Sequence, residues 1–224
     1  PDRKDGLGAA IGWLCGPTIA RAERRLDAIV HFAHVPWSGC KVPTKSGARM
    51  RGPRLVRAGV TDIVEAEKAL LRDDGRVAFI AGEARRAEEG GRQVLILVGL
   101  RDHAHRLAEA CAVAGCSDPT ILMGGQTEAA RMRGSPVVAT YGSCAKGGDF
   151  NPPPTLLILA SPRADVRQAM GRALQPQAPC RTIILDLVDG HQRLIKMARG
   201  RLRIYQRNDF EIQNDVWPYT GVAS

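Results

Sequence analysis

The chain has 224 residues, of which 44% are hydrophobic and 25% are charged, the composition of a globular protein with one good core and an appendage, or with two small domains. Its net charge of +9, from 32 basic and 23 acidic residues, favours a polyanionic partner, although many soluble proteins are basic without binding one. The longest apolar runs, residues 94–100 and 156–160, are far too short to cross a bilayer, which excludes a membrane-spanning segment and gives no reason to expect a membrane partner.

The cysteines indicate a reducing compartment. There are six, at scattered positions and without a Cys-x-x-Cys pair, and His31, His34 and Cys40 have the spacing of no standard zinc site. We therefore expect reduced structural thiols and no metal site. No signal peptide is visible, so we expect a cytoplasmic, nuclear or virion-associated protein rather than a secreted one.

The first 60 residues carry little regular pattern. Residues 4–14 have helical spacing that stops at Gly16-Pro17, and residues 18–36 alternate loosely, as in strands with a basic turn between them. Residues 39–59 are rich in Gly, Pro, Lys and Arg and lack an apolar period. They predict a long exposed loop, and basic residues concentrate here as they do in residues 21–25 and 193–207.

From residue 61 onward, helical and strand patterns alternate. Thr61 opens one helix, and Asp73 or Asp74 caps a second that ends at Gly90-Gly91. The later pattern predicts strands at residues 92–99, 120–123, 136–140, 155–160 and 181–188, and helices at residues 103–114, 164–174 and 191–203. This alternation predicts an α/β fold with a parallel sheet covered by helices on both faces. Ligands are then expected at the carboxyl ends of the strands.

Two strand ends carry candidate nucleic-acid contacts. The strand at residues 92–99 leads into a helix through Arg101, where free backbone N–H groups, the helix dipole and the arginine suit a phosphate. Gly124 and Gly125 follow the next strand and permit close approach of another backbone. The alternatives are a plain strand–helix junction with an exposed arginine, and a simple turn.

A third candidate segment follows the strand at residues 136–140, and we expect it to be a loop. The Thr140 hydroxyl can donate to a phosphate oxygen without imposing a sequence preference. Gly147 lets a backbone come close, and the Asp149 carboxylate can hold a sugar hydroxyl or orient a nearby arginine. A position between two apolar strands favours a functional loop. Near the end of the chain, by contrast, we expect Asp186 and Asp189 to cap the last helix rather than to bind metal.

In their order, these segments resemble motifs IV, V and VI of superfamily 2 helicases of the DEAD/DEAH-like kind. Residues 94–103 (VLILVGLRDH) are similar to motif IV, residues 137–149 (VVATYGSCAKGGD) to motif V, and residues 168–175 (QAMGRALQ) to motif VI. Residues 1–17 (PDRKDGLGAAIGWLCGP) look like the segment after the Ser-Ala-Thr motif of the first helicase domain. Residues 186–213 (DLVDGHQRLIKMARGRLRIYQRNDFEIQ) look like the closing segment of helicases of large DNA viruses, such as the poxvirus transcript-release type.

The resemblance implies a RecA-like fold, in which some residues contact nucleic acid and others contact ATP. Residues 1–60 would follow the first helicase domain with an exposed basic loop, and residues 61–224 would form the C-terminal RecA-like domain. Motif V has Lys-Gly-Gly-Asp here where many relatives have Glu-Gly-Leu-Asp. The implied nucleic-acid contacts, to DNA or RNA, are Thr140, Gly124, Gly125 and Arg101, and the implied ATP contacts are Gly147, Asp149, Gln168 and Arg172.

Motif VI carries the implied catalytic residues, Gln168 and Arg172. The family pattern is Gln-x-x-Gly-Arg-x-x-Arg, and its arginines reach the γ-phosphate and stabilise charge that develops during hydrolysis. Arg172 matches the first arginine, but the second position holds Gln175, whose neutral amide supplies neither a charge nor a guanidinium fork. Arg163, Arg167 and Arg181 lie nearby in sequence and could compensate. The alternative is that Gln168 and Arg172 form one solvated helical face.

The sequence lacks a phosphate-binding Gly-x-x-x-x-Gly-Lys-Ser/Thr loop, an Asp-Glu-x-x motif and a Ser-Ala-Thr motif. We therefore expect the C-terminal half of an ATP-dependent helicase. ATP and Mg²⁺ would be held mainly by an N-terminal RecA-like domain of the same polypeptide, and this half alone would be inactive. The alternative is a helicase-like module that binds nucleic acid or protein without turnover.

Overall fold

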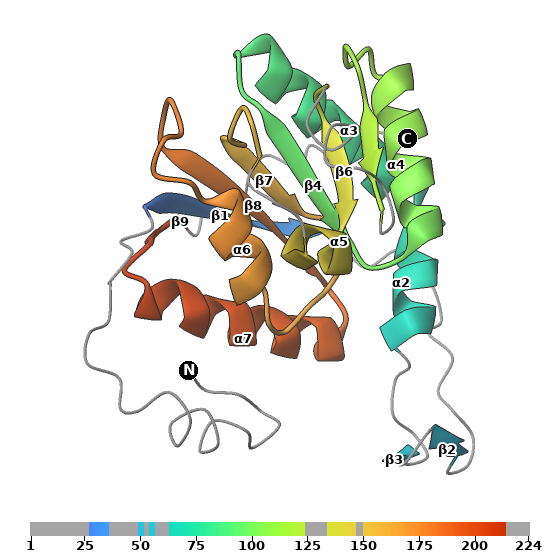
Figure 1. Ribbon diagram of the computed structural model, residues 1–224. Coiled ribbons are helices and arrows are strands. Elements are labelled where there is room, and N and C mark those ends of the chain that lie inside the picture. Colours follow the sequence, from blue (N-terminus) through green and yellow to red (C-terminus); the bar gives the residue numbers. More distant parts are fainter. Residues whose placement is uncertain are drawn as a thin grey trace, which may run out of the picture.

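A computed structural model of the protein describes residues 27–35, 49–51, 54–56, 63–123, 134–146 and 150–213. Its centre is one sheet of seven strands in the order β5–β6–β4–β7–β8–β1–β9, and every neighbouring pair is parallel (Figure 1). The strands are β1 (Ala28–Val35), β4 (Val94–Val98), β5 (Thr120–Leu122), β6 (Val137–Thr140), β7 (Leu156–Leu159), β8 (Thr182–Asp189) and β9 (Glu211–Gln213). The predicted α/β fold with a parallel sheet is confirmed.

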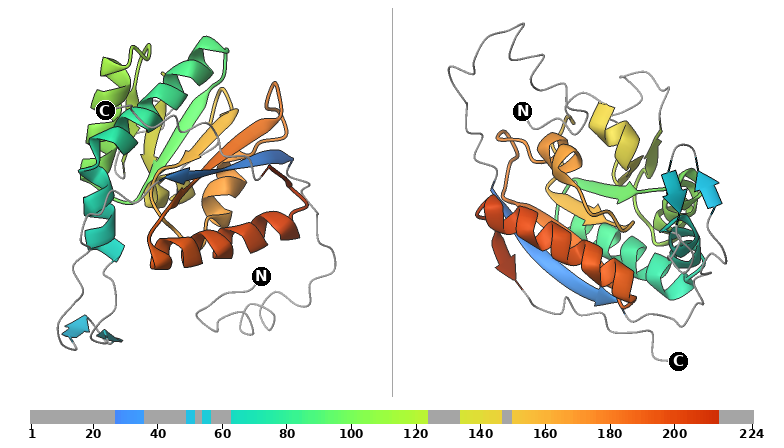
Figure 2. Two further views of the ribbon diagram at one scale, coloured as in Figure 1. Left: turned by 180° about the vertical axis from the view of Figure 1, so that it is seen from behind. Right: turned by 90° about the horizontal axis from the view of Figure 1, so that it is seen from below.

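Helices cover both faces of this sheet, because its central strands are apolar on both sides. In β4, Leu95 and Leu97 join the core on one face, and Val94, Ile96 and Val98 join the core on the other. The first core is completed by α5 (Tyr141–Lys146), α6 (Arg167–Ala173) and α7 (Gln192–Arg207), and the second by α3 (Asp74–Glu89) and α4 (Arg101–Val113). Figure 2 shows α3 and α4 on the back of the sheet. Near-continuous apolar strands of this kind are typical of parallel sheets.

Local signals set several helix ends as predicted. The Asp73 carboxylate accepts a hydrogen bond from the Arg76 backbone N–H (3.0 Å) and caps α3, which ends before Gly90 and Gly91. Gly91 has a φ of +73°, which glycine adopts without strain. Helix α2 (Ile63–Leu71) packs its Leu70 against α7.

Four predicted elements differ from the observed ones. Residues 39–59 were expected to be a loop throughout, but β2 (Arg49–Arg51) and β3 (Arg54–Val56) form an antiparallel pair within them. The segment after β6 was expected to be a loop, but it begins with helix α5 because Thr140 caps it. Helix α6 begins only at Arg167, after a turn in which the Asp165 carboxylate accepts from the Arg167 N–H (3.2 Å). Helix α7 continues to Arg207 because Tyr205 is buried against the sheet.

Strand β1 lies inside the sheet although it comes from the first 60 residues. It pairs along its whole length with β8 and over three residues with β9, the short strand that follows α7. The predicted helix at residues 4–14 lies outside the described residues. In the described part of the chain, no helix has both the length and the apolar character needed to span a membrane.

Candidate functional site

The candidate segments meet at the carboxyl edge of the sheet. Strands β6, β4 and β7 are neighbours, so the residues that follow them lie side by side. Thr140 ends β6, Arg101 begins the helix after β4, and residues 160–166, called here the β7–α6 loop, follow β7. Three segments that are far apart along the chain are thereby brought to one edge.

Thr140 has a structural partner of its own. Its hydroxyl accepts a hydrogen bond from the Ser143 N–H (3.2 Å) and lies 2.7 Å from the Ser143 hydroxyl, so Thr140 caps α5. The side chain is half-buried and therefore partly accessible at the edge. Arg101 is exposed at the start of α4, where the helix dipole favours an anion.

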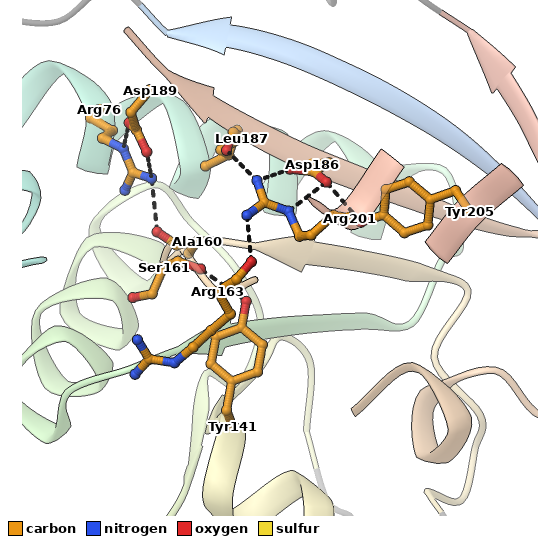
Figure 3. A network of polar contacts seen from close by, with 10 residues as sticks. All are labelled: Arg76, Tyr141, Ala160, Ser161, Arg163, Asp186, Leu187, Asp189, Arg201 and Tyr205. Carbon is orange, nitrogen blue, oxygen red and sulfur yellow. Dashed lines mark hydrogen bonds and ion pairs between the residues drawn. The ribbon is translucent and has the colours of Figure 1, made fainter. Parts of the chain in front are cut away.

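Side chains from several elements hold the β7–α6 loop in place (Figure 3). Four successive backbone carbonyls, of residues 160 to 163, each accept a hydrogen bond from a side chain. The donors are Arg76 to Ala160 (2.8 Å), Tyr141 to Ser161 (3.0 Å), Arg163 to Pro162 (3.2 Å) and Arg201 to Arg163 (2.7 Å). The loop is therefore tied to α3, α5 and α7 at once. Tyr141 directly follows Thr140, so its hydrogen bond connects the loop to the end of β6.

Ser161 connects the same loop to the β4–α4 junction. Its hydroxyl accepts a hydrogen bond from the Gly99 N–H (2.9 Å) and lies 3.1 Å from His103 Nδ1. Burial, with Arg76 and Arg106 nearby, lowers the pKa of His103 from 6.5 to about 3, so the imidazole is neutral at physiological pH. Its Nε2 atom has no hydrogen-bond partner within the described ranges.

A buried carboxylate from α2 pairs with the β7–α6 loop at the carboxyl edge. Glu67 is buried, and its Oε1 lies 2.5 Å from Arg163 Nη1. Burial raises the pKa of Glu67, and Arg163 partly offsets that rise by stabilising the charged form. The guanidinium of Arg163 also lies over the Tyr141 ring, 5.4 Å from its centroid. A Cβ on Gly99 would meet the ends of both the Glu67 and the Arg163 side chains, so a larger residue there would displace this pair.

The prediction that Asp186 and Asp189 cap the last helix is wrong. Asp186 Oδ1 lies 2.6 Å from Arg201 Nη2, and Asp189 Oδ1 lies 2.7 Å from Arg76 Nε, with all four side chains buried. The capping acceptor of α7 is the side chain of His191 instead. The aspartates pair because β8 is a central strand whose buried charges need compensation.

Residues 168–175, the segment that resembles motif VI, lie on α6 and just beyond its end. Gln168 is exposed on the first turn of this helix, and the backbone of Arg172 continues it one turn later. Gln175 lies beyond the end of α6, where its side chain is buried and accepts a hydrogen bond from Gln177 Nε2 (2.6 Å). Gln175 lines a hollow with Thr182, at the amino end of β8. Its amide therefore points away from the carboxyl edge.

The three arginines that could compensate for Gln175 all have acidic partners. Arg163 is bound to Glu67, and Arg167 is bound to Asp165 (2.8 Å). Arg181 pairs with Asp27 (2.8 Å) and with Glu211 at the amino end of β8. Of the three, Arg163 alone stands at the carboxyl edge.

The remaining predicted residues, Gly124, Gly125, Gly147 and Asp149, lie outside the described residues, as does the Arg172 side chain. Sequence reasoning missed the residues that organise the edge, namely Glu67, Gly99, His103, Tyr141 and Ser161. Only Gly99 left a signal, as a glycine at the end of an apolar strand. The others are recognisable only by their partners in space.

Comparison with protein families finds no match, and comparison with curated proteins finds none either. Solved structures do match. The crystal structure of T4 UvsW has a TM-score of 0.58 and 14% identity, over 84% of this chain and 41% of that one. S. cerevisiae Dbp5 L327V bound to RNA and ADP BeF3 has a TM-score of 0.53 and 10% identity, over 95% of this chain and 49% of that one. The chain spans less than half the length of either structure, and the likeness shows a RecA-like fold.

Proposed function

We propose that this chain is the C-terminal RecA-like lobe of an ATP-dependent nucleic-acid helicase or translocase. The observation that carries the proposal is a meeting at one sheet edge, where the segments that resemble motifs IV and V lie beside the loop that leads into the segment resembling motif VI. The three meet at the ends of the adjacent strands β6, β4 and β7, and the β7–α6 loop bonds to the other two through Tyr141 and Ser161. The RecA-like fold and a structural neighbour bound to RNA and ADP BeF3 support the same reading.

The proposed nucleic-acid contacts are Thr140, Arg101, Gly124 and Gly125. Thr140 and Arg101 end adjacent strands and offer a hydroxyl and a guanidinium, which both bind phosphate without reading sequence. We propose DNA or RNA as the partner. The relation to helicases of large DNA viruses, with a cytoplasmic, nuclear or virion-associated location, belongs to the same proposal.

The proposed ATP contacts are Gln168, Arg172, Gly147 and Asp149. Gln168 and Arg172 are four residues apart on α6, which places them on the same side of the helix. Gln168 is exposed and so free to reach a nucleotide bound outside this lobe. Arg172 would stabilise charge on the γ-phosphate, while ATP and Mg²⁺ would be held mainly by an N-terminal RecA-like lobe of the same polypeptide.

The β7–α6 loop would connect these two sets of contacts. Tyr141 follows Thr140 directly and donates to the Ser161 carbonyl, and α6 begins a few residues later. A shift of α5 on binding nucleic acid would therefore reach the helix that carries Arg172. The four side chains that fix the loop carbonyls make this connection stiff.

Gln175 favours a second candidate, a helicase-like module that binds nucleic acid or protein without turnover. The amide at this position is buried and bonded to Gln177, and the neighbouring arginines are engaged by carboxylates. With Arg172 as the one arginine left in the segment that resembles motif VI, such a lobe would bind its partner without hydrolysing ATP.

Nucleic-acid-stimulated ATPase activity of the whole motor distinguishes the two candidates. We expect Arg172→Ala to lower kcat about a thousandfold or more, because a missing arginine finger costs three to five decades in other nucleotide hydrolases. Arg85→Ala is the matched control, since Arg85 lies on α3, has no proposed role in binding or hydrolysis, and its surface pair with Glu89 contributes little.

A wild type without ATPase activity that still binds nucleic acid would favour the inactive module. Gln175→Arg would then be tested together with thermal unfolding, because a charge at this buried position destabilises the fold unless it reaches solvent. Normal wild-type activity that Arg172→Ala leaves unchanged would contradict the role of Arg172.

A further inference from the structure

Helix α7 carries several basic residues on its exposed side. Its sequence, QRLIKMARGRLRIYQR, contains no acidic residue. Arg201 points inward and is paired with Asp186. No ion pair joins the other five basic side chains to any part of the chain that the structure describes; they are Arg193, Lys196, Arg199, Arg203 and Arg207.

Four of these residues form one face of the helix. Lys196, Arg199, Arg203 and Arg207 are separated by three, four and four positions, which places them in a row, and all four are exposed. We call this row the basic face of α7. It extends about 16 Å along the helix axis, the rise of about five base pairs of duplex DNA.

This arrangement is costly for an isolated helix. Arg199 and Arg203, and Arg203 and Arg207, are like charges at i,i+4 and repel one another. Arg193 adds a positive charge to the first turn, where the helix dipole is also positive. A bound polyanion would remove both penalties.

In the described helices α2, α3 and α4, the basic side chains have acidic partners apart from Arg101. In α2, Lys68 pairs with Glu65 (2.9 Å), and in α3, Arg85 pairs with Glu89 (3.0 Å). Arg106 in α4 pairs with Asp74. The lack of acidic neighbours is therefore a property of α7 and does not follow from the net charge of the chain.

Hollows adjoin α7 at both of its ends. A hollow of about 1030 Å³ at the amino end is lined by His191, Arg193 and Lys196 beside Met197 and Ile63. A second, of about 350 Å³, at the carboxyl end is lined by Arg207 and Asn208 and by the Arg167–Asp165 pair. A chain of phosphates along the basic face would run from one hollow to the other.

We propose that the basic face of α7 is a second nucleic-acid surface, which binds the phosphate backbone without reading sequence. It is separate from the sheet edge, because α7 packs on β8 whereas Arg101 and Thr140 follow β4 and β6 (Figure 2). The inference rests on the proposed function in taking nucleic acid as the partner. This surface would bind duplex or single-stranded nucleic acid outside the site proposed for Thr140 and Arg101.

The test is the salt dependence of binding to short duplex DNA, measured by fluorescence anisotropy with the whole chain. We expect Arg199→Gln with Arg203→Gln to lower the affinity about tenfold or more at low salt. We also expect the slope of log K against log salt to fall by about 2, because two phosphate contacts are lost. Lys196→Gln with Arg207→Gln removes the two ends of the face and should give the same result.

The matched control is Arg72→Gln with Arg85→Gln, which removes two positive charges from α2–α3 surface positions. It should leave the slope close to the wild-type value. The basic-face variants should unfold at the same or a higher temperature, since they remove repulsion. An unchanged slope, or an equal fall in the control, would overturn the proposal, and so would lost binding to phosphatidylserine vesicles with DNA binding intact.

Failure of this proposal and failure of the proposed function give different results. Loss of single-strand binding in Thr140→Ala, with no effect of the basic-face variants, would remove the second surface and leave the motor lobe. The reverse result would keep the basic face and contradict the assignment of Thr140.

Discussion

At the scale of single residues, surroundings rather than residue type decide the role of each charged group. Arg76 and Arg201 are buried and neutralised by aspartates, whereas Arg199 and Arg203 are exposed and form no ion pair with the residues that the structure describes. In the Arg201–Asp186 pair, burial alone would lower the pKa of the arginine, but the charge and hydrogen bonds of Asp186 raise it, so the pair is ionised. The hydroxyl of Tyr205 donates to the same carboxylate (2.7 Å), and burial raises the pKa of that tyrosine well above its ordinary value.

The low pKa of buried His103 predicts that the fold loses stability in acid. Its pKa is 6.5 in the unfolded chain and about 3 in the folded protein, so the unfolded chain binds more protons at any pH between these values. Stability therefore falls as the pH falls, and this residue contributes a loss of about 2 kcal/mol between pH 7 and pH 5. Urea unfolding at the two pH values measures it.

His103→Gln should remove that part of the pH dependence. His105 lies on the exposed side of the same helix, so His105→Gln should keep the wild-type pH dependence. Identical pH profiles for the two variants would mean that His103 is not held in its neutral form.

At the scale of elements, the buried ion pairs fix which helix packs on which strand. Arg201 attaches α7 to β8 through Asp186, and Arg76 attaches α3 to the end of β8 through Asp189. Both arginines also bind carbonyls of the β7–α6 loop, so one set of contacts positions two helices and the loop before motif VI.

Breaking one such buried ion pair should lower the stability of the fold strongly. We expect Asp186→Asn to lower the free energy of unfolding by about 3–5 kcal/mol, because Arg201 would be left as a buried charge without compensation. Replacing both residues, as Asp186→Leu with Arg201→Met, should cost less than the two single changes together. Glu65→Gln, which breaks an exposed pair with Lys68, should cost about 1 kcal/mol or less in the same urea titration.

At the scale of the whole molecule, the sheet joins segments from both ends of the chain. Strand β1 fills the place between β8 and β9, and buries Val30 and Phe32 in one core and Ala33 and Val35 in the other. The division proposed from sequence, with residues 1–60 apart from residues 61–224, therefore cuts through the hydrogen-bonded sheet.

Truncation tests this dependence. A chain that begins at residue 61 would expose the edge of β8 and leave β9 without a partner, so we expect aggregation or loss of cooperative unfolding. A chain that begins at residue 27 keeps β1 and serves as the comparison. Equal stability of the two chains, measured by thermal unfolding, would show that β1 is dispensable.

The sequence alone determined the α/β architecture and the positions of most strands and helices. Strand β4 was recognisable because five consecutive apolar residues fit a strand that is buried on both faces. The capping aspartate of α3 and the glycines after it act within a few residues, so they too could be read along the chain. The segments that resemble motifs IV and V were found by their residues and order, and the strand order then placed them at one edge beside the loop before α6.

Only the tertiary structure decided which polar residues pair. Glu67 and Arg163 are 96 positions apart, and Arg76 and Asp189 are 113 positions apart, so no local pattern reports either contact. The same is true of Gln175, whose place in motif VI suggested a nucleotide contact but whose buried amide lies at the other end of the sheet. The hydrophobic periodicity of a sequence indicates which side of an element faces the core, and capping residues indicate where the element ends. The partner of a buried charge depends on chain crossings that bring distant segments together, and these exist only in the folded protein.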